Sequence, residues 1–223
     1  VEQELVYKNS SDSILNEIYL NDWANSFSSK TTPLAKVFSD NYQAAFHFEK
    51  NKNRGHSIII NINNNSENSL VWTRGDEVDI IRVKLDKKLN PGEAYTLKMK
   101  YHVVLPDDKF TRYGITNSGD FKIRYWYLAP AVFDEEWKVF SNKDLNDSYQ
   151  NPSTFKIKFH TPNYFNLISD LDLVSEETND IIKTTQLTGE NRMQVKLQLI
   201  KRSDFSTIET DKLVVTTNHT HKK

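Results

Sequence analysis

Hydrophobic and polar residues alternate along most of this 223-residue chain. The clearest run is EAYTLKMKYHVVL, residues 93–105, in which every second residue from Tyr95 is apolar and most of those between are Thr, Lys or His. The same alternation recurs in residues 154–160 and 193–201. A period of two places one face of a strand on a core and the other in water, as in antiparallel sheets. The pattern therefore predicts a chain made mainly of β-strands.

Turn-forming residues separate these runs at intervals of about ten residues, which is typical of sandwiches and strongly curved sheets. The turns are rich in Gly, Pro, Asn and Asp, the residues that tolerate tight backbone geometry. They fall at residues 74–77, 90–93, 117–120, 160–163 and 187–191. We predict an all-β fold, saddle-like or sandwich-like, with largely antiparallel sheets and one short helix. Residues 1–223 are expected to form a single domain.

One segment has a helical period instead. In residues 33–46, apolar side chains recur every three or four positions. Thr32 can cap this segment, and Pro33 then occupies the first helical position, where its missing N–H is not needed. The pattern predicts one helix over residues 33–46.

Residues 109–132 are unusually aromatic. Seven rings lie in or just beyond this stretch: Phe110, Tyr113, Phe121, Tyr125, Trp126, Tyr127 and Phe133. Such rings could form a binding face for sugar or protein, or they could pack inside a sheet. The alternation in residues 121–128 favours a strand that packs inward, with Trp126 as the exception. On this interpretation Tyr125, Tyr127 and Trp137 are expected to be buried.

Charge and cysteine content exclude several classes of protein. The 29 Lys and Arg residues nearly balance the 30 Asp and Glu residues, and they form no basic stripe, so we expect no nucleic-acid partner. No apolar run approaches the roughly 18 residues of a membrane helix, so no membrane span is expected. The absence of cysteine excludes disulfides, thiolate metal sites and a cysteine nucleophile.

The sequence contains no recognisable catalytic set. The six histidines are scattered, without the H-E-x-x-H arrangement of helical zinc peptidases. Only His219 and His221 lie close enough in sequence to bind a metal weakly. Three carboxylate clusters fall in predicted turns and are expected to be solvated: Asp76/Glu77/Asp79, Asp107/Asp108 and Asp134/Glu135/Glu136. We therefore predict no catalytic, cofactor-binding or metal-ligating residue in this chain.

Several strings nevertheless resemble one family. They are LNEIYLNDWANSFSSKTTPLAK (15–36), KFTRYG (109–114), WYLAPAV (126–132), Trp137 and FSNKDLND (140–147). These strings are similar to the N-terminal β-domain of M1-family metallo-aminopeptidases, the gluzincin group, in the form common among Bacteroidota. The resemblance covers about residues 1–175, and the rest is looser. Arg112 departs from the pattern, because relatives usually carry Gly in that turn.

The resemblance implies a saddle-shaped β-domain that precedes a thermolysin-like catalytic domain. In the family the catalytic domain carries H-E-x-x-H, a distal zinc-ligating Glu and the G-x-M-E-N loop, and none of these occurs here. It implies that zinc belongs to the catalytic domain, outside this segment. The expected partners are this chain's own catalytic domain and, for the full-length protein, peptide substrates. A periplasmic or cell-envelope location follows from the resemblance alone.

Two other functions stay open at the level of sequence. The chain could be a stand-alone β-sandwich module that binds carbohydrate or protein, or it could belong to an inactive M1-like scaffold. The coding sequence beyond Lys223 distinguishes them from the first interpretation.

Overall fold

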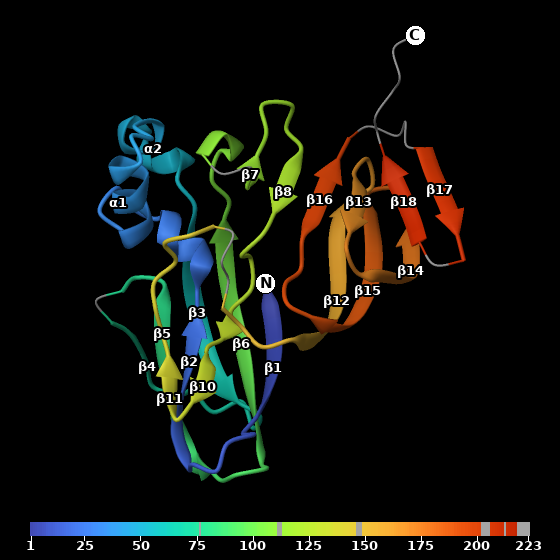
Figure 1. Ribbon diagram of the computed structural model, residues 1–223. Helices are drawn as coiled ribbons and strands as arrows, with labels where there is room; N and C mark the ends of the chain where they lie inside the picture. The colour runs from blue at the N-terminus through green and yellow to red at the C-terminus, as the bar shows by residue number, and fades with distance from the viewer. Residues whose placement is uncertain (76, 111–112, 146–148, 202–205, 212, 218–223) are drawn as a thin grey trace.

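The computed structural model describes residues 1–75, 77–110, 113–145, 149–201, 206–211 and 213–217. It is 51% strand and 11% helix, with several antiparallel sheets, which confirms the all-β prediction. The strands form two groups that lie side by side, an N-terminal half and a C-terminal half (Figure 1). Among the described residues, no helix is long and apolar enough to cross a membrane.

The N-terminal half is built from two sheets with a shared hydrophobic core. One sheet has the order β1–β6–β3 and the other the order β4–β5–β2–β9. The strands of the first are β1 (Glu2–Lys8), β6 (Ala94–Val104) and β3 (His56–Asn64); those of the second are β4 (Trp72–Arg74), β5 (Ile80–Leu89), β2 (Leu15–Asn21) and β9 (Ala129–Pro130).

The structure confirms the alternation predicted for β6, because its apolar positions are buried in this core. Tyr95, Leu97, Met99 and Tyr101 are buried, and all four belong to one cluster. The second sheet completes that cluster with Ile18 and Leu20 of β2 and with Ile81 and Val83 of β5. A period of two thus separates the buried face of β6 from a face that carries Lys and His.

Short helices cap one end of the N-terminal half (Figure 1). They are η1 (Trp23–Phe27), α1 (Pro33–Asp40), α2 (Ala45–Phe48) and η2 (Asn51–Asn53). Thr32 caps α1 as predicted, since its Oγ1 accepts a hydrogen bond from Ala35 N at 3.2 Å. The prediction of one helix over residues 33–46 was wrong in length. Tyr42 adopts φ of +59°, which a continuous right-handed helix cannot contain, and α2 begins only afterwards.

The C-terminal half is a second pair of sheets around a separate core. Their orders are β12–β15–β14 and β13–β16–β8–β7, and the hairpin β17–β18 lies beside them, whereas the hairpin β10–β11 packs against the core of the N-terminal half through Phe133 and Trp137. The bounds are β7 (Gly114–Ile115), β8 (Phe121–Ile123), β10 (Val132–Asp134), β11 (Glu136–Lys138), β12 (Ser153–Pro162), β13 (Asn166–Ser169), β14 (Asp172–Thr178), β15 (Ile182–Arg192), β16 (Leu197–Ile200), β17 (Ser206–Thr210) and β18 (Leu213–Thr217). A short η3 (Asp108–Phe110) precedes β7.

The aromatic stretch contributes to all three hydrophobic clusters, which supports the packing interpretation. Tyr125 is buried, while Tyr127 and Trp137 are only half-buried. The predicted strand over residues 121–128 ends at Ile123, because Tyr125 has φ of +55° and turns the chain toward β9. Thr111 and Arg112, in the turn that departs from the family pattern, lie outside the described residues.

Candidate functional site

The histidines do not converge on a common site. His47 lies in α2, His56 in β3, His102 in β6 and His160 in β12. His219 and His221, the pair considered for weak metal binding, lie outside the described residues. Within the described part of the chain, no group of three or more His, Cys, Asp or Glu side chains is placed to hold a metal ion.

Three carboxylates of the predicted turns pair with nearby lysines at the surface: Asp107 with Lys109, Asp108 with Lys122 and Glu136 with Lys138. Asp108 lies 2.8 Å from the Lys122 ammonium, and Glu136 lies 3.1 Å from that of Lys138. Exposed pairs of this kind contribute little to stability. Asp76 lies outside the described residues. The prediction of solvated turn carboxylates was wrong for Asp79, which is fully buried.

Asp79 accepts hydrogen bonds from the segment that joins the two halves. Its Oδ1 accepts a hydrogen bond from Ser141 Oγ at 2.6 Å, and its Oδ2 accepts one from Asn142 N at 2.8 Å. Its backbone oxygen also accepts a bond from Asp22 N at 2.7 Å. Burial raises the pKa of the Asp79 carboxyl, and the bonds from Ser141 and Asn142 oppose that effect. We call Asp79, Ser141 and Asn142 the connector clasp.

The raised pKa of Asp79 gives a pH prediction. Its folded-state pKa lies above the unfolded value of 3.8, so the folded protein binds the proton more tightly. The contribution of Asp79 to stability therefore falls as pH rises above about 4. We expect the stability advantage of the wild type over Asp79→Asn to grow as pH is lowered from 7 to 4, measured by denaturant midpoints. Asp134→Asn, at an exposed site, is the control. An advantage that grows toward neutral pH would contradict the assignment.

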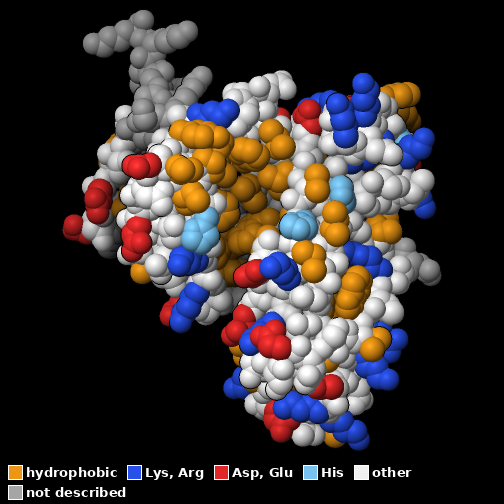
Figure 2. Space-filling view, turned by 180° about the vertical axis from the view of Figure 1, so that it is seen from behind, with side chains coloured by type: hydrophobic (Ala, Val, Ile, Leu, Met, Phe, Trp, Pro, Cys, Tyr) orange, Lys and Arg blue, Asp and Glu red, His pale blue; other side chains and the backbone are white. Residues whose placement is uncertain are grey.

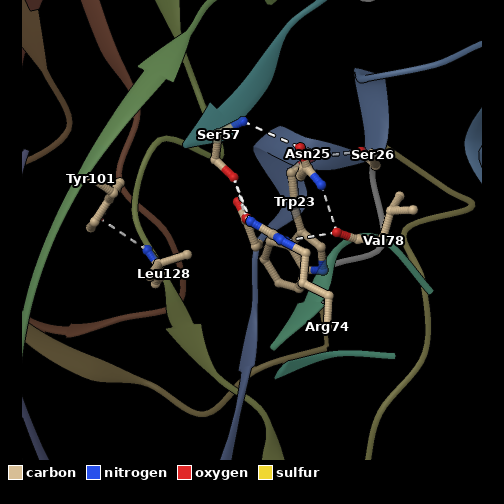
Figure 3. A network of polar contacts seen from close by, with 9 residues as sticks. Trp23, Asn25, Ser26, Ser57, Arg74, Val78, Tyr101 and Leu128 are labelled. Carbon is tan, nitrogen blue, oxygen red and sulfur yellow. Dashed lines mark hydrogen bonds and ion pairs between the residues drawn. The ribbon is translucent and has the colours of Figure 1, made fainter. Parts of the chain in front are cut away.

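A second buried network joins η1 to both sheets of the N-terminal half (Figure 3). Arg74 Nη2 lies 2.5 Å from Asp22 Oδ2, and Ser57 Oγ donates to the same oxygen. Arg74 Nη1 also donates to Val78 O at 2.7 Å, and Asn25 Nδ2 donates to that oxygen at 2.6 Å. These bonds satisfy groups that burial would otherwise leave unpaired.

The electrostatics of this network indicate a structural role. Asp22 is 2% exposed, and its desolvation raises the pKa of the carboxyl, while Arg74 and the bond from Ser57 oppose the rise. The partners of Asp22 come from β3 and β4, at residues that show no motif in the sequence. Sequence analysis therefore missed the network. It positions η1 against both sheets.

Exposed apolar side chains are concentrated on parts of the surface. Figure 2 shows hydrophobic side chains gathered in a hollow between the two halves and spreading over one of them. Among the described residues of the C-terminal half, the exposed large hydrophobic residues are Ile115, Tyr164, Leu173, Val174, Ile181, Ile182, Met193, Ile208, Leu213, Val214 and Val215. The surface of the described residues is thus not evenly polar.

The β17–β18 hairpin shows this exposure most clearly. Its register pairs Ile208 with Val215 and Thr210 with Leu213, so that the three aliphatic side chains share one face. Their exposed fractions are 64%, 43% and 61% for Ile208, Val215 and Leu213. A two-stranded hairpin is only marginally stable by itself in water, and an uncovered apolar face adds to that cost. The exposed apolar face of this hairpin is therefore suited to contact with another protein surface.

Solved structures with a similar fold are found, although no similar sequence is. No family model matches the chain, and no curated protein matches it. The crystal structure of an M1 zinc metallopeptidase from Deinococcus radiodurans aligns with a TM-score of 0.51 at 13% identity, over 96% of this chain and 42% of that one. A point variant of the same enzyme aligns with the same values.

These alignments concern the fold alone, because the identity is low. This chain spans 42% of the length of the structures that it resembles, so more than half of each solved chain has no counterpart here. The β-rich architecture of this chain is therefore that of one part of an M1 zinc metallopeptidase.

Proposed function

We propose that residues 1–223 are a non-catalytic N-terminal β-domain of an M1-type zinc aminopeptidase, which braces the catalytic domain and forms one wall of its peptide-binding cleft. The observation that carries the proposal is the alignment of nearly the whole chain with less than half of an M1 zinc metallopeptidase. The family-like strings of residues 15–36 and 109–147 support it independently of the fold.

The exposed apolar surface supports a role in docking. Contacts between domains of one chain commonly bury roughly 600–1,500 Å². The apolar face of β17–β18, with the exposed Leu173 and Val174 of β14, provides aliphatic side chains for such a contact. A large hydrophobic surface of this kind is unusual unless another surface covers it.

Zinc would be held outside this chain. The described residues offer no group of three ligating side chains, so they do not fit a catalytic zinc site. In an M1-type enzyme the bound zinc activates a water molecule for peptide hydrolysis. The residues of this chain would shape the cleft and position the catalytic domain.

The coding sequence that surrounds these residues tests the proposal directly. An H-E-x-x-H motif within about 150 residues after Lys223, followed by a further Glu, is expected. A degenerate motif at that place would favour an inactive scaffold. A stop codon directly after Lys223 would refute the proposal and favour a stand-alone binding module.

The isolated chain is expected neither to retain zinc nor to hydrolyse aminoacyl substrates. The physical reason is that the described His, Asp and Glu side chains form no group of three placed to hold a metal ion, and that the buried Asp22 and Asp79 carboxylates accept hydrogen bonds from protein groups. Bound metal after dialysis against zinc and turnover of an aminoacyl-anilide are the measurements. Stoichiometric zinc that survives dialysis, with turnover abolished by a chelator, would show that these residues contain an active site.

A further inference from the structure

The β13–β16–β8–β7 sheet has, on its face away from the C-terminal core, a hollow of about 330 Å³ that the proposed function does not use. Its lining comes from β8, β16 and the turn between β7 and β8. The lining residues are Thr116, Ser118, Asp120, Phe121, Lys122, Gln198 and Ile200. This volume lies at the lower end of the range found for small-ligand sites, roughly 300–1,000 Å³. We propose that this hollow binds a neutral saccharide, one or two sugar units in size.

The turn that forms one wall is held in a fixed shape. Asp120 N donates to Thr116 Oγ1 at 3.0 Å, and Ser118 Oγ donates to Asp120 Oδ2 at 2.7 Å. The two hydroxyls lie 2.8 Å apart, and because the Ser118 hydrogen points to Asp120, Thr116 donates to Ser118. Gly119, with φ of +74°, permits this turn. The wall is therefore organised before any ligand arrives, which lowers the entropic cost of binding.

Donors and acceptors alternate around the hollow. Gln198 and Lys122 are direct neighbours in the register of β16 and β8, and both line the hollow. The exposed Gln198 amide offers two donors and an acceptor, whereas Thr116 and Ser118 keep acceptor lone pairs. A sugar ring carries hydroxyls that both donate and accept, so it matches such a mixed lining. Ile200 supplies the apolar side chain of the lining, which suits the C–H face of a sugar, whereas the Phe121 ring packs against Phe165 in the core on the opposite face of the sheet.

Charge favours a neutral ligand over an ion. Lys122 is the single cation of the lining and pairs with Asp108 at 2.8 Å, outside the hollow. Asp120 is the single anion, and its Oδ1 accepts a hydrogen bond from Lys201 N at 3.0 Å. An anionic ligand would meet the Asp120 carboxylate, and a cation would meet the Lys122 ammonium. Neither charge sign dominates the site.

The test is a titration of isotopically labelled protein followed by amide chemical shifts. Maltose, cellobiose and N,N′-diacetylchitobiose are the probes, with glycerol and inorganic phosphate as comparison ligands. We expect saturable shifts for at least one disaccharide, confined to residues 116–123 and 197–201, with a Kd on the order of 1 mM. Gln198→Ala is expected to weaken binding by about tenfold, since it removes the amide bonds.

Gln186→Ala is the matched control, because Gln186 is an exposed glutamine on β15 in the other sheet. It should leave the Kd unchanged. The proposal is overturned if no disaccharide gives saturable shifts, if glycerol or phosphate produces the same shifts at the same concentration, or if Gln198→Ala and Gln186→Ala behave alike. Because these measurements do not involve peptide hydrolysis or zinc, their failure leaves the proposed domain function untouched.

Discussion

Replacing Arg74 with Met is expected to lower the free energy of unfolding by about 3–5 kcal/mol. The substitution removes the guanidinium that lies 2.5 Å from Asp22, whose side chain is 2% exposed. The carboxylate would then remain buried without its cationic partner. Val78 O and Ser57 Oγ would also lose their bonds to Arg74. Denaturant-induced unfolding at neutral pH measures the loss.

Arg82→Met is the matched control. Arg82 pairs with Glu17 at the same distance of 2.5 Å, but its side chain is 56% exposed. Exposed pairs contribute roughly 0–1 kcal/mol, so this variant should be close to the wild type. Equal losses in the two variants would show that burial of Asp22 does not determine the effect. A near-neutral Arg74→Met would mean that Asp22 is neutralised by protonation in the folded protein.

Phe27→Ala is expected to cost about 3–5 kcal/mol, as large-to-small substitutions of buried aromatic residues do. Phe27 is fully buried in the cluster between η1, α1 and α2. Its ring centroid lies 5.3 Å from that of Tyr113 and 6.4 Å from that of Phe46. The cavity would separate the helices from the aromatic residues of the connecting segments. Denaturant midpoints, with unfolding followed by tryptophan fluorescence, measure the change.

Phe48→Ala provides the comparison, since Phe48 is an aromatic residue of the neighbouring α2 that is 88% exposed. Its removal should change the free energy of unfolding by no more than about 0.5 kcal/mol. A small effect of Phe27→Ala would show that the helical segments collapse around the missing ring or contribute little to global stability.

Strands could be predicted from the sequence wherever one face is buried and the other is exposed to solvent. In β6, β12 and β16 the buried and exposed positions follow the alternation, because each strand covers a core with one side only. The helix cap at Thr32 could also be predicted, since a side-chain oxygen followed by Pro33 is a local signal. These features depend on neighbouring residues in the sequence.

Features that depend on distant residues could not be predicted. Asp79 lies in a segment that has the composition of a turn, and only its contacts with Ser141 and Asn142 explain its burial. Tyr125 continues an apolar alternation, yet it takes φ of +55° and stacks edge-on against Trp23 and Tyr113. The hollow beside Lys122 likewise depends on the register between β8 and β16. Tertiary context overrides local preference at all three places.

The sheet β13–β16–β8–β7 has a consequence for how the chain folds during synthesis. β8 ends at Ile123, whereas its partner β16 begins at Leu197. At about 5–20 residues per second, the ribosome delivers β16 roughly 4–15 s after β8. Until then β8 is paired with β7 on one edge only, and its other edge lacks β16, although the β1–β6–β3 sheet is already complete in the emerged chain. The nascent protein thus passes through a stage with the β1–β6–β3 sheet formed and the β7–β8 hairpin still exposed at one edge and on its apolar face, at which chaperones that bind short hydrophobic segments would act.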